Sequence, residues 1–334
     1  MSCHSVCRAF LIAIFGTLAI AAHAVPSYTI LDLGTLAGPT SRGYGVNDKG
    51  QVTGVTGAVY DPFLGGYFQH AFVWDKTSGM TDLGTITGSW SSGGNAINDN
   101  GQVTGQSWVV YPFSMHAFVW DASSGMSSLG TLEGGADMEL SYGFGINNSG
   151  GVTGRSTTTD GPDHAFLWDA ASGMIDLGSV GLGSGYSSGN GINDSGVVTG
   201  SYSISGPLWD VSHAYVWDAV NGVTDIGTLG GLGSVGVAIN DIGQVAGNYS
   251  LFVPDPAHPG PIHAFTWDAA SGTTDLGTLG GADASSYADA INDAARVVGW
   301  SEIEADLENR AFLWDPVDGM LNLQDLVADF SDWE

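Results

Sequence analysis

The sequence predicts an all-β fold, a β-propeller of four-stranded blades, and the first observation behind this is a repeat. One string of this repeat starts at His70, His116, His164, His213, His263 and Arg310, and in most units it reads His-Ala-Phe-x-Trp. They are 46, 48, 49, 50 and 47 residues apart, close to the roughly 40–50 residues of kelch and WD repeats. One short unit cannot bury its own apolar face, so we expect the units to stack around a ring. A β-solenoid is the alternative, although its coils are usually shorter.

The second observation is that each unit contains four strand-like segments and no helical periodicity. In unit two, the first strand ends at 95–98 and the second covers 102–105. The turn between them reads Asn-Asp-x-Gly, which is typical of a tight hairpin because Asn, Asp and Gly tolerate a positive φ. The third strand is the His-Ala-Phe-x-Trp string, and the fourth reads like 80–84 of unit one, Met-Thr-Asp-Leu-Gly. We therefore predict antiparallel four-stranded units.

The number of blades stays open at this point. Six Asn-Asp hairpins and six third strands stand against seven fourth-strand segments, the extra one being 28–36 or 320–326. Six blades with a spare strand, or seven with one incomplete, both fit this count. The last residues, 330–334, resemble the entry to a further hairpin.

The first 24 residues have the pattern of a secretory signal peptide. Arg8 precedes an apolar run over 9–22, and Ala22-His23-Ala24 offers a cleavage site. Both cysteines, Cys3 and Cys7, lie in this segment. We therefore expect a secreted, extracellular protein, with the periplasm as the alternative. Its single repeat domain would cover 25–334, without disulfides and without an integral membrane segment.

The charge excludes some partners. The net charge is −28, with seven Lys and Arg in the whole chain. Phosphate neutralisation needs clustered basic side chains, so we expect no nucleic-acid binding. No cofactor is expected. Calcium is a minority alternative suggested by an alternating acidic stretch that ends at Glu308, namely Glu302, Glu304, Asp306 and Glu308. We expect a monomer.

The strings His-Ala-Phe-x-Trp, Asp-Leu-Gly-Thr-Leu-Gly-Gly and Ile-Asn-x-x-Gly-x-Val-x-Gly recur in this order from about residue 28 onward. They resemble the HAF repeats of a family of bacterial extracellular proteins. The resemblance implies export and a repeat fold, and it implies no activity. Unit six departs from the pattern, with Arg310 in place of His and Ala-Ala-Arg at 294–296.

The repeated His and Trp side chains are interpreted as structural. The histidines occupy equivalent places in five blades, so the symmetry would spread them around the ring, which argues against a shared metal. We expect each to donate a hydrogen bond to a turn carboxylate or carbonyl. The repeated tryptophans are expected in the core: Trp74, Trp120, Trp168, Trp217, Trp267 and Trp314.

Function is expected on the face that carries the second-to-third loops, because these loops differ between units. Aromatic residues outside the repeat gather there. The candidate ligand contacts are Trp108, Tyr111, Trp209, Phe252 and Trp300. Exposed aromatic rings beside Asp and Asn suit carbohydrates, although aromatic residues also pin long loops to neighbouring blades.

The leading hypothesis is a non-catalytic binding module for a carbohydrate or a protein at the cell surface. The second is a polysaccharide lyase or glycoside hydrolase that uses acids near the ring axis. The third is a structural repeat protein of a surface or matrix layer.

Overall fold

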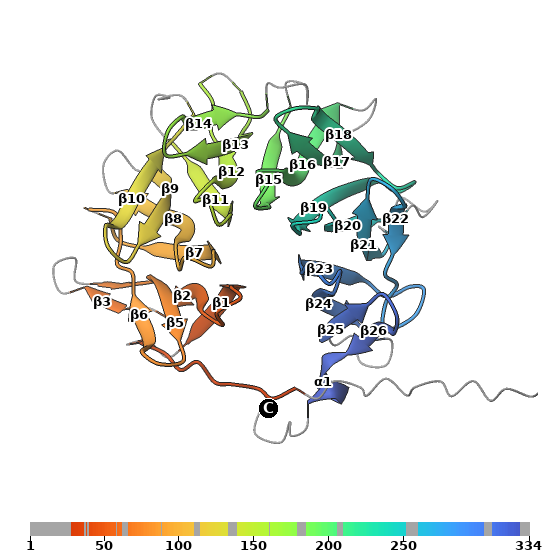
Figure 1. Ribbon diagram of the computed structural model, residues 1–334, viewed down its shortest axis with the longest axis horizontal. Helices are drawn as coiled ribbons and strands as arrows, with labels where there is room; N and C mark the ends of the chain where they lie inside the picture. Colours follow the sequence, from red (N-terminus) through yellow and green to blue (C-terminus); the bar gives the residue numbers. More distant parts are fainter. Residues whose placement is uncertain are drawn as a thin grey trace, which may run out of the picture.

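The computed structural model shows six four-stranded antiparallel sheets arranged in a ring (Figure 1), which confirms the β-propeller. It describes residues 28–36, 38, 40–57, 59–61, 66–87, 89–109, 114–132, 139–159, 161–178, 185–205, 210–251, 260–303 and 309–327. In each blade the four strands pair in chain order, with the first strand nearest the axis (Figure 1).

Blade one has one additional hairpin, β3–β4, in the connection between the second and third strands of its sheet. Blade one has β1 (Ser41–Val46), β2 (Val52–Thr56), β3 (Val59–Asp61), β4 (Gly66–Phe68), β5 (Ala71–Asp75) and β6 (Gly79–Asp82). Blade two has β7 (Ser92–Ile97), β8 (Val103–Val109), β9 (Ser114–Asp121) and β10 (Gly125–Gly130). Blade three has β11 (Ser141–Ile146), β12 (Val152–Ser156), β13 (His164–Asp169) and β14 (Gly173–Asp176).

The last three blades repeat this plan, and a short helix follows blade six. Blade four has β15 (Ser187–Ile192), β16 (Val198–Ser205), β17 (Asp210–Asp218) and β18 (Gly222–Gly227). Blade five has β19 (Gly233–Ile239), β20 (Val245–Ser250), β21 (Ile262–Asp268) and β22 (Gly272–Asp275). Blade six has β23 (Ser286–Ile291), β24 (Val297–Glu302), β25 (Asn309–Asp315) and β26 (Gly319–Asn322), followed by α1 (Leu323–Leu326). In the described part of the chain, no helix is long and apolar enough to cross a membrane.

The predicted turns close the first hairpin of each blade, with the sequence Asn-Asp-x-Gly in four blades, Asn-Asn-Ser-Gly in blade three and Asn-Asp-Ala-Ala in blade six. In blade one, Asn47 Oδ1 accepts hydrogen bonds from the backbone N–H groups of Lys49 and Gln51. Gly50 has φ +73°, a left-handed conformation that glycine adopts without a steric penalty. Blade six places Ala295 at the equivalent position with φ +59°, so an L side chain occupies a left-handed position there.

The core lies between the blades. Ala71, Val73 and Leu83 of blade one pack against Ile97, Val103 and Phe118 of blade two. Thr53 Oγ1 donates to the carbonyl of Phe72 at 2.8 Å, and its buried side chain faces Gly94 of blade two. A Cβ at Gly94 would overlap this hydroxyl, so glycine sets how closely two blades approach. The same Thr–Gly contact recurs at the next three interfaces, as Thr104–Gly143, Thr153–Gly189 and Thr199–Gly236.

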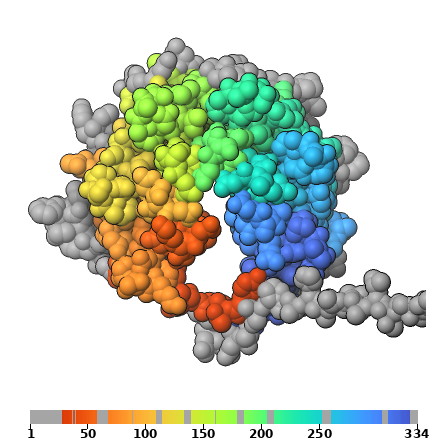
Figure 2. Space-filling view, viewed as in Figure 1, coloured from red at the N-terminus to blue at the C-terminus, as the bar shows by residue number. Residues whose placement is uncertain are grey.

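A wide gap separates blade six from blade one, and the N-terminal segment crosses its outer edge (Figures 1 and 2). Tyr28 donates its backbone N–H to the carbonyl of Leu326 at 2.9 Å, and it forms a parallel bridge with Val327. The described residues thus form six complete blades and one further segment that carries the fourth-strand sequence. The candidate hairpin entry at 330–334 lies outside the described residues.

Candidate functional site

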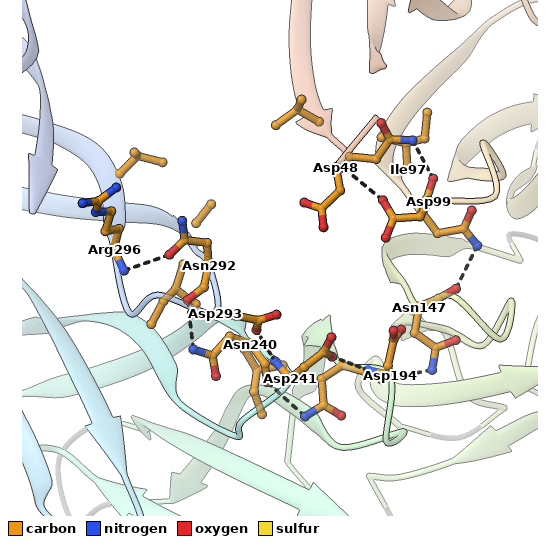
Figure 3. Close-up of a pocket in the computed structure, with 18 of the residues that line it drawn as sticks. Asp48, Ile97, Asp99, Asn147, Asp194, Asn240, Asp241, Asn292, Asp293 and Arg296 are labelled. Atoms are coloured by element: carbon orange, nitrogen blue, oxygen red, sulfur yellow. Dashed lines mark hydrogen bonds between the residues drawn. The ribbon is translucent and has the colours of Figure 1, made fainter. Parts of the chain in front are cut away.

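A hollow near the axis opens between the first-hairpin turns of all six blades, which read Asn-Asp except for Asn147-Asn148 in blade three (Figure 3). It has a volume of about 550 Å³. Each blade contributes the last residue of its first strand and the two turn residues that follow, such as Ile97, Asn98 and Asp99. Because these turns stand at the end of the strand nearest the axis, they line one mouth of the central channel.

The turn Asn side chains join each blade to the next. Asn47 Nδ2 donates to the carbonyl of Asn98 at 2.8 Å, a contact between blades one and two. The same bond follows at each described interface, as Asn98 to Asn147 (2.8 Å), Asn147 to Asn193 (3.0 Å), Asn193 to Asn240 (3.1 Å) and Asn240 to Asn292 (3.0 Å). All five bonds run in the same direction around the ring.

The residues that follow these Asn residues form a second chain of bonds. The backbone N–H of Asp48 donates to Asp99 Oδ1 at 2.9 Å, and each later turn donates to its successor in the same way. The remaining pairs are Asp99 to Asn148, Asn148 to Asp194, Asp194 to Asp241 and Asp241 to Asp293. Four carboxylates and the amide oxygen of Asn148 therefore act as blade-to-blade acceptors.

Five Asp side chains make this axial hollow acidic: Asp48, Asp99, Asp194, Asp241 and Asp293. Arg296 also lines it, but its Nε donates to Asp315 at 2.8 Å. This charge favours cationic or polyhydroxylated molecules over anions. Among the described residues, no three His, Cys, Asp or Glu side chains converge as a metal site would require.

A second hollow, of about 170 Å³, lies between blades one and two. Trp108 and Met115 line it where the second strand of blade two ends and the third begins. Tyr44 of β1 lines the other side, and the polar residues are Gln69, Ser91, Ser92 and Gln106. Trp108 is 44% exposed and Tyr44 is 55% exposed. The hollow thus offers two accessible aromatic side chains together with amide and hydroxyl groups.

The equivalent space between blades three and four holds a large side chain. Arg155 takes the place of Val55 in the repeat, and its guanidinium lies 4.7 Å from the ring centre of Tyr142. Its Nη1 donates to the hydroxyl of Tyr186 at 2.7 Å. Burial alone would lower the pKa of Arg155, but the bond to Tyr186 and nearby charges raise it, so the guanidinium stays charged. The small side chain of Val55 leaves room at the first interface.

The predicted aromatic contacts do not form one cluster. Trp108 lies within β8 and Trp300 within β24, so both belong to strands and not to the loops in which they were expected. Trp300 is half-buried and stacks on Tyr287, with ring centres 4.1 Å apart and planes at 19°. The ladder of hydrogen-bonded strand pairs continues through both tryptophans, which shortens the loops. Tyr111, Trp209 and Phe252 lie outside the described residues.

Tyr44 and Gln106 line the hollow between blades one and two, but the sequence analysis did not name them as candidate ligand contacts. Each stands at a position that varies between units while its neighbours are repeated. Tyr44 is replaced in the other units by Asn95, Phe144, Asn190, Val237 and Asp289. Variation at a single position of an otherwise constant strand was the signal that could have identified it.

The repeated histidines each bond to the fourth strand of their own blade. The Nδ1 atoms of His70, His164, His213 and His263 lie 3.0 Å from Asp82, Asp176, Asp225 and Asp275. Burial alone would raise the pKa of Asp82, but the hydrogen bond from His70, the N–H of Gly84 and the charge of His70 lower it. In blade two Ser128 replaces the Asp, and His116 Nδ1 lies 2.9 Å from its Oγ.

The repeated tryptophans line the interblade core with varying burial. Trp217 is buried at 8% exposure, whereas Trp74, Trp120, Trp168, Trp267 and Trp314 are half-buried. Trp120 and Trp267 pack at the margin of hydrophobic clusters between blades. These side chains belong to the scaffold and not to either hollow.

The fold and these hollows define the chain as a β-propeller. No family model matches it, and no curated protein does. Among solved structures, it is similar to a point-mutant form of puromycin hydrolase complexed with PGG, at 12% identity and a TM-score of 0.41. That match covers 89% of this chain and 56% of the hydrolase chain. A point-mutant form of Aleuria aurantia lectin in complex with Fucalpha1-6GlcNAc matches at 12% identity and a TM-score of 0.36, over 86% of this chain and 96% of the lectin.

Proposed function

We propose that this propeller is a secreted, non-catalytic binding module that takes a carbohydrate residue between blades one and two. The observation that carries the proposal is the exposure of Trp108 and Tyr44 in one hollow with Gln69, Ser91 and Gln106. Aromatic faces pack against the apolar C–H face of a sugar, and amides and hydroxyls pair with its hydroxyl groups.

The size of the hollow limits the ligand. Pockets for drug-sized molecules have volumes of about 300–1,000 Å³, whereas this one has about 170 Å³. It therefore suits a single sugar ring, such as one residue of a longer glycan whose neighbours stay in solvent. The net charge of −28 disfavours acidic polysaccharides, so neutral or amino sugars are the expected class.

The test is a titration of the protein with neutral and amino oligosaccharides, followed by tryptophan fluorescence and calorimetry. Trp108→Ala and Tyr44→Ala should each weaken binding by about 2 kcal/mol, roughly thirtyfold in Kd. Trp300→Ala is the matched control, because it removes the same side chain from blade six and should leave Kd unchanged. Equal binding by Trp108→Ala and the parent protein would remove this hollow from consideration.

The same samples distinguish the other two hypotheses. Release of reducing ends or unsaturated products would indicate a glycoside hydrolase or lyase, with the axial acids as the first residues to substitute. A folded protein that binds no glycan and releases no product would favour a structural repeat of a surface layer.

A further inference from the structure

The five described interfaces between consecutive blades use one set of contacts. The backbone N–H of Ala71 donates to Ser92 Oγ of the next blade at 2.9 Å, and Ser92 Oγ donates to the carbonyl of Gly84. Equivalent Ala-to-Ser bonds join the remaining blades, from Ala117 to Ser141, Ala165 to Ser187, Ala214 to Ser234 and Ala264 to Ser286. Together with the Asn and Asp chains, these bonds give every described interface the same polarity, because the Ala N–H, the Asn Nδ2 and the turn N–H of one blade each donate to the next blade.

Blade six presents the donor half of this interface to the gap. Ala311 is exposed, whereas the equivalent Ala residues of the other five blades are 0% exposed. Val298, at the position of the buried Thr53, is 39% exposed. At the other interfaces the Ala N–H donates to a Ser Oγ and the Asn Nδ2 donates to an Asn carbonyl of the next blade. Among the described residues, the Ala311 N–H and Asn292 Nδ2 have no such partner. Blade six therefore ends in a face built for a further blade.

Blade one presents the acceptor half on the opposite side of the gap. Val46 is 68% exposed, whereas its equivalent in blade two, Ile97, is 7% exposed. Gly43 stands where Gly94 receives Thr53, but no side chain of a preceding blade approaches it within the described residues. Asn47 and Asp48 line the axial hollow beside this face.

The outermost position of the gap is already filled. Asp32 Oδ1 accepts the N–H of Gly34 at 2.8 Å, as Asp82 accepts that of Gly84 at the end of β6. Ser41 Oγ donates to the carbonyl of Gly34 at 2.7 Å, as Ser92 donates to that of Gly84. Residues 28–34 thus reproduce the two contacts that link the end of a fourth strand to the first strand of the next blade, without a first, second or third strand inside them. Figure 2 shows the opening that remains between this segment and the axis.

We propose that the gap is a docking site for the first three strands of a unit with this chain's own repeat sequence. Such a unit offers a Gly to face Val298 and a Thr to face Gly43. Its Asn-Asp or Asn-Asn turn would also continue the two series of blade-to-blade hydrogen bonds near the axis, the one made by Asn side chains and the one made by the turn N–H groups. A complete blade of a second copy does not fit, because it brings its own fourth strand to a position that residues 28–34 occupy. The inference concerns the gap alone and is independent of the sugar hollow between blades one and two.

The experiment is a titration of the protein with a peptide of residues 141–169, which spans β11, β12 and β13. The expected result is saturable one-to-one binding that raises the thermal midpoint of the protein. The matched control peptide carries Gly143→Val, which places a larger side chain against Val298. On the protein, Val46→Glu and Val298→Glu should weaken binding about tenfold or more, because a carboxylate would be buried without a partner. Val220→Glu, at a turn residue that is 91% exposed, should bind like the parent.

Linking the repeat segment covalently to the protein makes its docking intramolecular, so that docking no longer depends on the peptide concentration. Residues 131–169 appended after Val327 should protect the backbone N–H of Ala311 from hydrogen exchange, because this N–H would then donate to the serine of the added unit. The proposal is overturned if neither the peptide nor the linked segment protects this N–H group. It is also overturned if the parent peptide and the Gly143→Val peptide bind with equal affinity. It is also overturned if sedimentation shows a dimer that Val46→Glu dissociates, because a second copy would then occupy the gap.

Discussion

Asn147 of blade three is hydrogen bonded to Asn193 of blade four, through Nδ2 and a backbone carbonyl 3.0 Å apart, although the residues are 46 positions apart in the chain. The same side chain uses Oδ1 to accept from the N–H of Gly151 at 2.8 Å within its own turn. One buried amide thus closes a hairpin and joins two blades.

Replacing this amide should destabilise the ring. Asn147→Ala removes both functions and leaves the Asn193 carbonyl with the Gly196 N–H alone, at a cost of about 1–3 kcal/mol in the free energy of unfolding. The measurement is the midpoint of urea unfolding, followed by tryptophan fluorescence. Asn221→Ala, in an exposed turn of blade four, is the control and should shift the midpoint little. A similar shift in both variants would contradict the interblade role.

The Thr–Gly contact predicts unequal effects of one substitution at two equivalent positions. A Cβ at Gly43 or at Gly94 lies 3.0 Å from the valine of the following strand, Val52 or Val103. Gly94 alone also faces the hydroxyl of Thr53. Gly94→Ala should therefore destabilise the protein by about 1–3 kcal/mol more than Gly43→Ala. Equal thermal midpoints for the two variants would show that blade spacing does not depend on this glycine.

Blade six contains a residue whose substitution should stabilise the protein. Ala295 has φ +59° where the other Asn-Asp turns have glycine. Ala295→Gly should relieve the left-handed strain and raise the free energy of unfolding by about 1 kcal/mol, which the greater flexibility of glycine in the unfolded chain offsets only in part. Gly50→Ala, the reverse change in blade one, should lower it. Stability that falls in Ala295→Gly would refute this explanation.

His116 should make stability depend on pH below neutrality. Burial lowers the pKa of His116 from its ordinary value of 6.5, although the charge of Glu139 acts in the opposite direction. The folded protein therefore binds this proton less readily than the unfolded chain, so stability falls as the pH drops below about 6.5.

Urea midpoints at several pH values between 7.5 and 5 measure this dependence. His116→Gln retains a polar side chain near Ser128, 2.9 Å from the His116 Nδ1, without the proton. The variant should lose less stability than the parent over this range. Parallel curves for the two proteins would show that His116 does not contribute to the pH dependence.

The strands and turns of the repeat could be predicted from the sequence because residues close together in the chain determine them. Asn47 and Gly50 set a turn whatever follows, and the alternation in the His-Ala-Phe-x-Trp string sets which side chains face a neighbouring blade. The four-stranded blade and the ring were therefore predicted correctly. Trp108 is exposed, and its role as a ligand contact stays a prediction. Its strand continues further than expected, because ladder pairing with β9 depends on a partner strand and not on local sequence.

The sequence by itself determined the unit: four strands, their turns, and the side chains that face a neighbouring blade. Only the tertiary structure decided how the units meet. It brought Tyr44 to Trp108 and joined Asn47 to Asn98 across blades. It also left Val46 and Ala311 exposed on the two sides of a gap. The physical reason is that the spacing of blades around an axis results from all interfaces at once, and no single repeat contains that information.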